Sequence, residues 1–438
     1  MPKKIGIMRE KKNQWERRVP LIPVDVKSLI ENHGTEIIIQ PSKKRVFHDD
    51  EFRAAGAILR EDLADCDLIF AIKEIKISDL IPRKTYLFFS HTIKGQSYNM
   101  PMLQKLLDLK CTLLDYERMI DEKNQRLIYF SYHAGIAGMI ESLWAYGQRL
   151  AWERIPSPFE AIKQCYMYED QAAAEIAFAA LGEEIKKGLP AAISPLVIGI
   201  TGYGNVSRGA QHMLALLPIE KIEPSDLSGL HQQQARKNDR IFQVVFKEKD
   251  MFVPVSSDNA FDLQDYYKNP QKYRAGFERY LPELDILINA SFWDPHYPKH
   301  VSREGLKSLF SSADKPCLRV IGDISCDVNG GIECTSHVTD PGNPVYVYQP
   351  AGDEIREGVA GHGPVIMAVD NLPSELPKDA SVYFSSILKT LVPDLLKADW
   401  QCPFDGLDLP FALKQAVIVY QGQLSADYRY LEDFIEKH

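Results

Sequence analysis

Two titratable side chains stand where apolar runs of the sequence end. Lys73 closes the run Asp67–Lys73, and His91 follows the run Tyr86–Ser90. Ligands of open α/β sheets bind beyond the carboxyl ends of the strands, so both side chains can converge on one site. Burial lowers the pKa of a lysine and an imidazole titrates near neutral pH, which predicts an acid–base pair. The alternatives are a solvated strand-end lysine and a hydrogen-bonded turn histidine.

Further polar groups surround these two positions in the sequence. Arg17 and Arg18 lie in the loop after the first predicted strand, and Lys94 and Gln96 follow the histidine. A guanidinium group binds a carboxylate through two parallel hydrogen bonds, so these residues predict a site for an anionic substrate. The alternative for the arginines is a solvated run of charge.

A glycine turn follows another apolar run. Leu196–Ile200 is bounded by turn residues, as in a buried strand, and Gly202 and Gly204 come directly after it. Asn205 and Val206 would then begin a helix. A strand, a glycine turn and a helix N-terminus together form an anion site suited to the pyrophosphate of a dinucleotide.

The glycine motif is imperfect. Ser207 stands where the third glycine of the G-x-G-x-x-G pattern is expected, and Gly209 follows where the helix would pack closely on the strand. The alternative is an ordinary tight turn between a strand and a helix.

Two carboxylates could contact the nucleotide. Glu223 ends the strand after the glycine turn, where an acidic side chain accepts from the adenosine ribose and repels a 2′-phosphate, which favours NAD over NADP. Arg236 and Lys237 could bind a phosphate instead. Asp323 follows another strand and could contact the nicotinamide ribose or the substrate amine, or could form a turn or cap.

Composition restricts the class of protein. The formal net charge of −9 argues against a nucleic-acid or anionic-membrane surface. The seven cysteines show no metal-ligand spacing, so we expect reduced, mostly buried thiols and no metal site. The N-terminus lacks the apolar region of a signal peptide and no run approaches a membrane span, so a cytoplasmic location is expected.

The 438 residues are too many for one ordinary core. Strands alternate with helical segments, which predicts an α/β fold with two doubly wound, Rossmann-like parallel-sheet domains separated by a cleft. We expect a discontinuous substrate domain, 1–134 plus 364–438, and a dinucleotide-binding domain, 135–363. Helices are expected over 134–152, 159–181, 382–396 and 410–424, and residues 247–282 are not assigned.

Several stretches resemble a known superfamily. The opening Met8–Glu10 with Glu16–Pro23, and the stretch Asp323–Glu333, resemble alanine dehydrogenases and transhydrogenases. More specific stretches are similar to the lysine-ketoglutarate reductase domain of the bifunctional lysine-degrading enzyme and to the fungal lysine-forming saccharopine dehydrogenases. These stretches are Gln40–His48, Ile81–Gln96, Gly202–Gln211 and Asp370–Pro377.

The resemblance covers nearly the whole chain and implies a reaction. L-Lysine and 2-oxoglutarate would condense to an imine, and a nicotinamide cofactor would reduce it to saccharopine, or the reverse would occur. Lys73 and His91 match the family's acid–base pair. Arg18 matches an arginine expected at the substrate carboxylates or supporting Lys73. The chain resembles a free-standing reductase, and a homo-oligomer is possible.

The sequence leaves alternatives for both the cofactor and the activity. Reductase domains of this family typically use NADPH and the fungal enzymes NAD, whereas Glu223 favours NAD. One alternative function is an amino-acid dehydrogenase of the alanine type, against which the stretch 92–96 argues. The other is a non-catalytic, dinucleotide-sensing protein.

Overall fold

The computed structural model describes residues 3–230, 237–256, 259–312 and 316–435. The chain forms two compact units, which are Met1–Tyr129 with Pro377–His438 (unit 1) and Phe130–Leu376 (unit 2). The expected boundaries were 134/135 and 363/364. The first boundary lies earlier in the sequence, because all of helix α4 (Ser131–Trp152) belongs to unit 2. The second boundary lies later, because strand β16 (Val365–Met367) is part of the unit 2 sheet.

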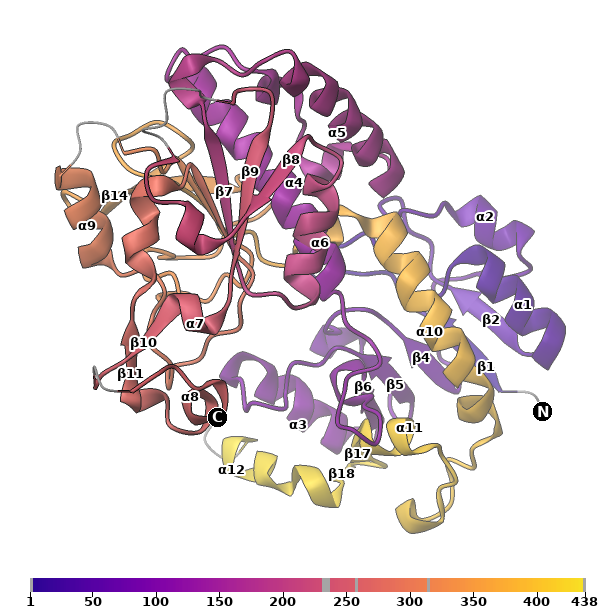
Figure 1. The fold of residues 1–438 in the computed structure, drawn as a ribbon. Helices are drawn as coiled ribbons and strands as arrows, with labels where there is room; N and C mark the ends of the chain where they lie inside the picture. The colour runs from indigo at the N-terminus through magenta and orange to yellow at the C-terminus, as the bar shows by residue number, and fades with distance from the viewer. Residues whose placement is uncertain (1–2, 231–236, 257–258, 313–315, 436–438) are drawn as a thin grey trace. The chain divides into compact units, whose positions relative to one another are not determined.

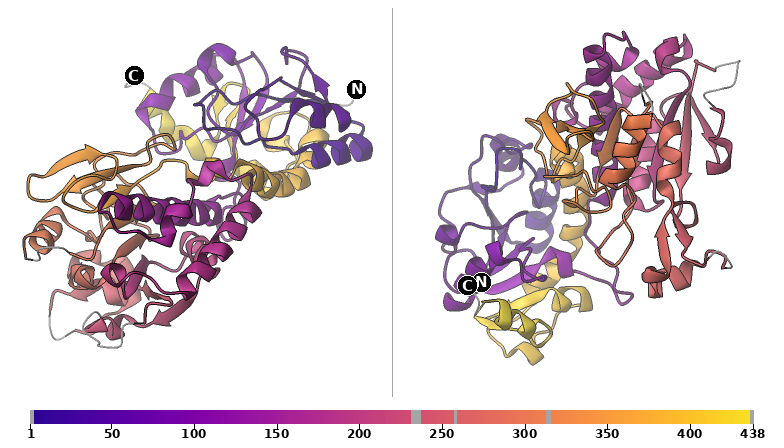
Figure 2. Two further views of the ribbon diagram at one scale, coloured as in Figure 1. Left: turned by 90° about the horizontal axis from the view of Figure 1, so that it is seen from above. Right: turned by 90° about the vertical axis from the view of Figure 1, so that its left-hand side faces the viewer.

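Unit 1 contains an eight-stranded sheet with the order β18-β17-β6-β5-β4-β1-β2-β3. The six strands from β6 to β3 are parallel, and β17 and β18 are antiparallel additions at one edge. In both views of Figure 2 the yellow C-terminal segment lies against the indigo and violet N-terminal segment. The strands are β1 (Lys4–Ile7), β2 (Glu36–Ile39), β3 (Ile58–Leu59), β4 (Leu68–Phe70), β5 (Thr85–Phe88), β6 (Thr112–Asp115), β17 (Val417–Tyr420) and β18 (Gln423–Leu424).

The helices of unit 1 begin and end at residues that favour these positions. Pro23 opens α1, where its missing N–H costs nothing, and Gly34 ends it with a left-handed φ of 61°. The helices are α1 (Pro23–His33), α2 (Asp49–Ala54), α3 (Met100–Asp108), α10 (Pro377–Lys397), α11 (Phe411–Gln415) and α12 (Glu432–Ile435).

The prediction of a helix over 410–424 is wrong. Only α11 is helical there, and the chain then enters β17, which pairs antiparallel with β6. The apolar run of β17 is fully buried, and a short buried run has the same composition in a strand as in a helix. The pairing partner lies about three hundred residues earlier, so local periodicity carries no information on it.

Unit 2 contains a second eight-stranded sheet, with the order β15-β14-β16-β13-β12-β7-β9-β8. Figure 1 labels β7, β9 and β8 next to one another in this sheet. Its strands from β16 to β8 are parallel. Two sheets dominated by parallel strands confirm the predicted α/β class. The strands of this sheet are β7 (Leu196–Thr201), β8 (Ile219–Ile222), β9 (Ile241–Phe246), β12 (Ile286–Asn289), β13 (Val320–Asp323), β14 (Val345–Gln349), β15 (Glu354–Glu357) and β16. β10 (Phe252–Pro254) and β11 (Tyr273–Ala275) form a separate pair.

The central strands of the unit 2 sheet are buried on both faces. Ile198 and Ile200 of β7 belong to an apolar cluster that includes α4, α5 and α6, whereas Val197 belongs to another that includes Leu306 of α9. Successive side chains of a strand point to opposite faces, so the two clusters cover opposite faces of the sheet. The other helices of the unit are α5 (Gln171–Lys186), α6 (Asn205–Leu214), α7 (Glu248–Met251), α8 (Leu263–Lys268) and α9 (Arg303–Ser312).

Helix α4 packs directly against the backbone of α6. A Cβ atom on Gly135 would lie 1.9 Å from the Val206 carbonyl oxygen, and one on Gly209 would lie 2.0 Å from that of Tyr132. The expectation that Gly209 packs on the strand is therefore wrong, because its close neighbour is α4. Only glycine permits this approach of two helices.

The expected helix over 159–181 is partly wrong. The stretch contains the 3-10 helices η4 (Pro158–Ala161) and η5 (Cys165–Met167), and α5 begins only after Asp170. The Asp170 carboxylate accepts a hydrogen bond from the Ala173 N–H at 3.0 Å, which makes Asp170 the N-cap of α5.

The unassigned stretch 247–282 forms α7, α8 and the antiparallel pair β10–β11 in its described part. All seven cysteines are free thiols, four of them buried and three half-buried. No helix among the described residues is long and apolar enough to span a membrane.

Two carboxyl groups face each other in the core of unit 2. Glu141 of α4 and Glu375 of the 3-10 helix η11 (Leu372–Glu375) are 0% and 1% exposed, and the two groups are close enough for the charge of Glu141 to act on Glu375. Glu141 accepts from the Cys165 N–H at 2.6 Å. Burial raises the pKa of Glu141 to about 7, and burial together with the Glu141 charge raises that of Glu375 well above its usual range. The pair therefore retains a proton near neutral pH.

This pair predicts a pH-dependent stability. A carboxyl group with a raised folded-state pKa stabilises the fold fully below its ordinary pKa of 4.5, and the contribution is lost as the pH rises through about 7. The free energy of unfolding should therefore fall between pH 4.5 and about 7, and Glu141→Gln should reduce this fall by at most about 3 kcal/mol. Urea unfolding between these pH values measures it. Glu183→Gln, at a side chain 68% exposed, should keep the wild-type slope. An unchanged slope in Glu141→Gln would assign the proton to another group.

Candidate functional site

The two predicted acid–base residues follow neighbouring strands of unit 1. β4 and β5 pair in parallel, and Lys73 and His91 each come shortly after their strand ends. Both side chains are half-buried. The structure therefore brings both residues to the carboxyl edge of the same sheet, where ligands of such folds bind.

Glu74, the residue after Lys73, contacts His91 and Lys12. Its carboxylate lies 2.7 Å from Nδ1 of His91 and 2.7 Å from the Lys12 ammonium group. Burial alone would raise the pKa of Glu74, but the hydrogen bonds from His91 and Lys12 outweigh it and lower the pKa to about 2. A carboxylate on one ring nitrogen fixes the orientation of an imidazole and leaves the other nitrogen for proton transfer. Sequence reasoning missed Glu74, although it directly follows Lys73.

Two further observations show how tightly these strand ends are held. His91 has a left-handed φ of 48°, an unfavourable conformation for a residue other than glycine, and such positions cluster at functional sites. The buried Glu10 carboxylate accepts from the Ile72 and Lys73 N–H groups at 2.6 and 3.1 Å. Burial and the nearby Glu16 charge raise the pKa of Glu10 to about 7.

The two predicted arginines differ in position. Arg18 is 2% exposed, and its Nε and Nη2 bind the Glu16 carboxylate at 2.8 and 2.6 Å. This burial fits the supporting role for Arg18 better than a contact with a substrate carboxylate. Arg17 is half-buried and donates through Nε to the Lys44 carbonyl at 3.2 Å, so its terminal nitrogens could bind a carboxylate.

Lys94 and Gln96 lie in one turn after His91. The Gln96 side-chain oxygen accepts from the Lys94 N–H at 3.2 Å, which fixes the turn. The Lys94 side chain is exposed and Gln96 is half-buried. Lys94 is therefore the more accessible donor for an anion.

The glycine turn of unit 2 has the geometry of a phosphate cradle. Gly202 has a left-handed φ of 80°, and a Cβ there would lie 3.0 Å from the Ala290 carbonyl oxygen. Gly204 is the N-cap of α6, and a Cβ on it would meet no protein atom within 4 Å. Asn205 and Val206 follow in the first turn of α6, where backbone N–H groups have no intrahelical acceptor. These residues fit a nucleotide pyrophosphate.

A buried polar network supports this turn. Asn289, which ends β12, accepts from the Thr201 hydroxyl at 2.8 Å and donates to the Asp323 carboxylate at 2.9 Å. Asp323 is fully buried and also accepts from Ser325 and Thr335 at 2.8 and 2.6 Å, and burial raises its pKa. The structure thus engages Asp323 with protein donors that hold the ends of β7, β12 and β13 together.

Strand order separates Glu223 from the glycine turn. β8 lies at the edge of the sheet, and β9 is inserted between it and β7. The position next to the end of β7 therefore follows β9, where Glu248 accepts from the hydroxyl groups of Tyr203 and Tyr267 at 3.4 and 2.8 Å. Glu223 follows β8 and is exposed. Sequence reasoning missed Glu248 because the strand order is not a local property.

The sequence also suggests Arg236 and Lys237 as ligands of a phosphate. Lys237 binds the Glu220 carboxylate at 2.9 Å. Arg236 lies outside the described residues.

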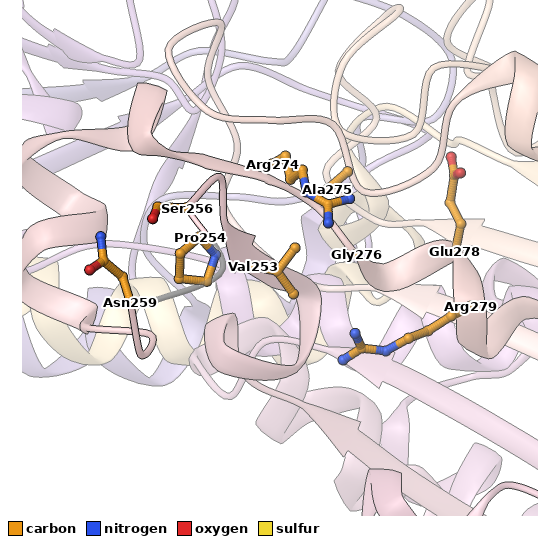
Figure 3. Close-up of a pocket in the computed structure, with 9 residues that line it drawn as sticks. All are labelled: Val253, Pro254, Ser256, Asn259, Arg274, Ala275, Gly276, Glu278 and Arg279. Atoms are coloured by element: carbon orange, nitrogen blue, oxygen red, sulfur yellow. The ribbon is translucent and has the colours of Figure 1, made fainter.

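A cavity of about 510 Å³ lies at the hairpin β10–β11 (Figure 3). Its lining includes Arg274 and Arg279, and the latter already donates to the Asp250 carbonyl and to Tyr280. None of the predicted site residues lines this cavity.

The cradle yields a direct prediction. Gly204→Ala keeps an ordinary φ of −75° and meets no protein atom, so its unfolding midpoint should not change. The added methyl group would occupy the space a phosphate needs, so NADH affinity measured by fluorescence titration should fall about tenfold or more. Gly406→Ala is the control, because its Cβ would also lie in nearly open space. Unchanged NADH affinity in Gly204→Ala would exclude this turn from nucleotide binding.

Comparison with known proteins relates the chain to a group of enzymes. Residues 6–137 match the family described as "Alanine dehydrogenase/PNT, N-terminal domain". The chain is 37% identical to the alpha-aminoadipic semialdehyde synthase of Arabidopsis thaliana and 34% identical to that of Bos taurus, over 98% and 99% of its own length. It covers 41% and 48% of these relatives, so it spans less than half of each.

A shorter relative and two solved structures agree with this result. The saccharopine dehydrogenase [NAD(+), L-lysine-forming] of Neurospora crassa is 27% identical, over 90% of this chain and 91% of that protein. An L-alanine dehydrogenase and the transhydrogenase of Sinorhizobium meliloti have TM-scores of 0.61 and 0.55 at 18% and 15% identity. Each structural match covers at least 96% of both chains and shows the same fold. These matches confirm the resemblance to alpha-aminoadipic semialdehyde synthases and to a lysine-forming saccharopine dehydrogenase, and they confirm the fold of alanine dehydrogenase and transhydrogenase.

Proposed function

We propose that this chain is a nicotinamide-dependent oxidoreductase that forms saccharopine from L-lysine and 2-oxoglutarate, or cleaves it in reverse. The observation that carries the proposal is the group at the carboxyl edge of the unit 1 sheet, where Lys73 and His91 follow adjacent strands and Glu74 binds His91. The names of the similar proteins support this substrate class. The expected cytoplasmic location remains a prediction.

The reaction requires several proton transfers. The ε-amine of lysine attacks the ketone carbon of 2-oxoglutarate, and the nitrogen loses protons while the departing oxygen gains them and leaves as water. Lys73 and His91 are suited to exchange these protons, because two bases of different chemistry can serve the nitrogen and the oxygen in turn. When bound, the nicotinamide supplies the hydride that reduces the C=N bond.

The remaining polar groups suit the charges of the substrates. 2-Oxoglutarate carries two carboxylates, and Arg17 and Lys94 are the more accessible cations of the predicted set. Arg18 acts from below the surface through its pair with Glu16. Glu74 keeps its negative charge near neutral pH, since its pKa is about 2, and can stabilise an imidazolium that forms during proton transfer.

The nucleotide is assigned to the glycine turn of unit 2, and the preference for NAD is assigned to Glu248. A carboxylate at the end of the strand next to the glycine turn accepts from the ribose 2′-hydroxyl and repels a 2′-phosphate. Two tyrosine hydroxyls hold Glu248 in place. Glu248 follows the strand next to β7, whereas Glu223 follows the edge strand β8, so Glu248 is the better candidate for the contact with the ribose.

The activity is tested by following NADH and NADPH absorbance with 2-oxoglutarate and L-lysine, and with L-ornithine or ammonia in parallel wells. Lysine-dependent oxidation is expected. Lys73→Met should keep nucleotide affinity and lower turnover about 10²- to 10⁴-fold, the usual contribution of general acid–base catalysis.

Other outcomes of this assay would contradict the proposal. Ammonia-dependent oxidation would identify an amino-acid dehydrogenase of the alanine type. Nucleotide binding without turnover for any amine would indicate a sensor. Unchanged turnover in Lys73→Met would remove this lysine from the mechanism. Lys76→Met is the control, since Lys76 is an exposed lysine of the same loop.

Cofactor preference is tested at Glu248. Glu248→Ser should remove the repulsion of a 2′-phosphate and shift the ratio of NADP to NAD affinity about tenfold towards NADP. Glu223→Ser is the matched control and should leave the ratio unchanged. A shift in Glu223→Ser alone would show that the adenosine ribose lies against the edge strand.

A further inference from the structure

A cavity of about 1020 Å³ lies at the amino ends of the parallel strands of unit 2, whereas the glycine turn lies at their carboxyl ends. It is lined by the residues that precede the parallel strands, Pro195 before β7, Asp285 before β12 and Arg319 before β13. The C-terminal turn of α4 forms another wall. β7 has six residues and is about 20 Å long, so this cavity is separate from the site proposed for the nucleotide.

The charges of the lining are arranged in a chain. Glu153 binds Arg149 at 2.7 Å and Arg319 at 3.0 Å, and Arg319 also reaches Asp285 at 3.4 Å. The second Asp285 oxygen accepts from the Val197 N–H at 2.9 Å. Burial raises the pKa of Asp285 to about 7, against the effects of Val197 and Arg319. Both acidic groups are thus bound by protein donors.

Arg154 adds a cation beyond this chain. It is exposed, lines the cavity and follows the end of α4 with a left-handed φ of 62°. The lining therefore holds three guanidinium groups and His362 against two carboxylates. An excess of positive charge beside bound carboxylates favours an anionic ligand.

The same cavity has aromatic and apolar walls. Trp152 is 43% exposed, and the Arg149 guanidinium lies 4.7 Å from its ring centre. Phe310 and Ile155 line the cavity and are half-buried. Ligand pockets combine such apolar walls with a few placed polar groups, at a volume of about 300–1,000 Å³.

We propose that this cavity is a second ligand site, which binds a small organic anion, a carboxylate or a phosphate monoester, with a flat apolar body. The anionic group would meet Arg154, and the flat body would lie along Trp152. Arg319 and Asp285 directly precede β13 and β12, whose other ends hold Asp323 and Asn289. A ligand in this cavity would not contact the nucleotide. It would affect the glycine turn through the strands between them, as in a regulatory site.

Calorimetric titration of the full chain with phenyl phosphate, and separately with phenylacetate, tests the site and distinguishes the two anions. Saturable binding of at least one is expected. Arg154→Ala and Trp152→Ala, both at exposed side chains, should each weaken it about tenfold. Arg274→Ala is the matched control, an exposed arginine in the cavity of Figure 3, and should leave binding unchanged.

Binding should persist in Gly204→Ala, which keeps this test independent of the proposed nucleotide site and of the proposed reaction. Absence of saturable binding by both probes would overturn the proposal. So would an equal loss in Arg274→Ala, or inorganic phosphate binding as tightly as phenyl phosphate. Loss of binding in Gly204→Ala would assign the probe to the glycine turn and would also overturn it.

Discussion

The contact between the backbones of α4 and α6 is the constraint on which unit 2 depends. Added Cβ atoms would lie 1.9 Å from the Val206 carbonyl oxygen at Gly135 and 2.0 Å from that of Tyr132 at Gly209, so neither side chain can be enlarged without moving a helix. The Val206 carbonyl belongs to the first turn of α6. The N-terminus that would receive the pyrophosphate is therefore positioned by a helix that precedes it in the chain, and not only by the glycine turn.

Unit 1 positions its polar groups by a different means, with carboxylates that bridge strand ends. Glu10 binds backbone N–H groups after β4, whereas Glu74 binds the Lys12 ammonium group and Nδ1 of His91. Both side chains are largely buried, yet the pKa rises to about 7 in Glu10 and falls to about 2 in Glu74. At Glu10 burial and the Glu16 charge raise the pKa more than the backbone N–H groups lower it, whereas at Glu74 the hydrogen bonds from His91 and Lys12 outweigh burial. The imidazole therefore has a charged neighbour throughout the neutral range.

Local patterns predicted much of this architecture, and non-local pairings account for the failures. The strand over 241–246 and the helix stop at Gly34 follow from composition and turn chemistry alone. The sequence of β17 predicts a helix, because its partner β6 is far away in sequence and leaves no local signal. The insertion of β9 beside β7 likewise places Glu248, and not Glu223, after the strand that neighbours the glycine turn. The burial of Arg18 against Glu16 depends on tertiary packing, which spacing does not encode.

The short strands of unit 2 have polar anchors at both ends. β13 has four residues and is about 13 Å long, with Arg319 before it and Asp323 at its end. β12 lies beside it, with Asp285 before it and Asn289 at its end, and the two strands are linked at one edge by an ion pair and at the other by an amide–carboxylate bond. Their apolar residues are fully buried, and packed interiors have low compressibility. A displacement of Arg319 or Asp285 is therefore expected to be transmitted along the strands to the network that holds the glycine turn.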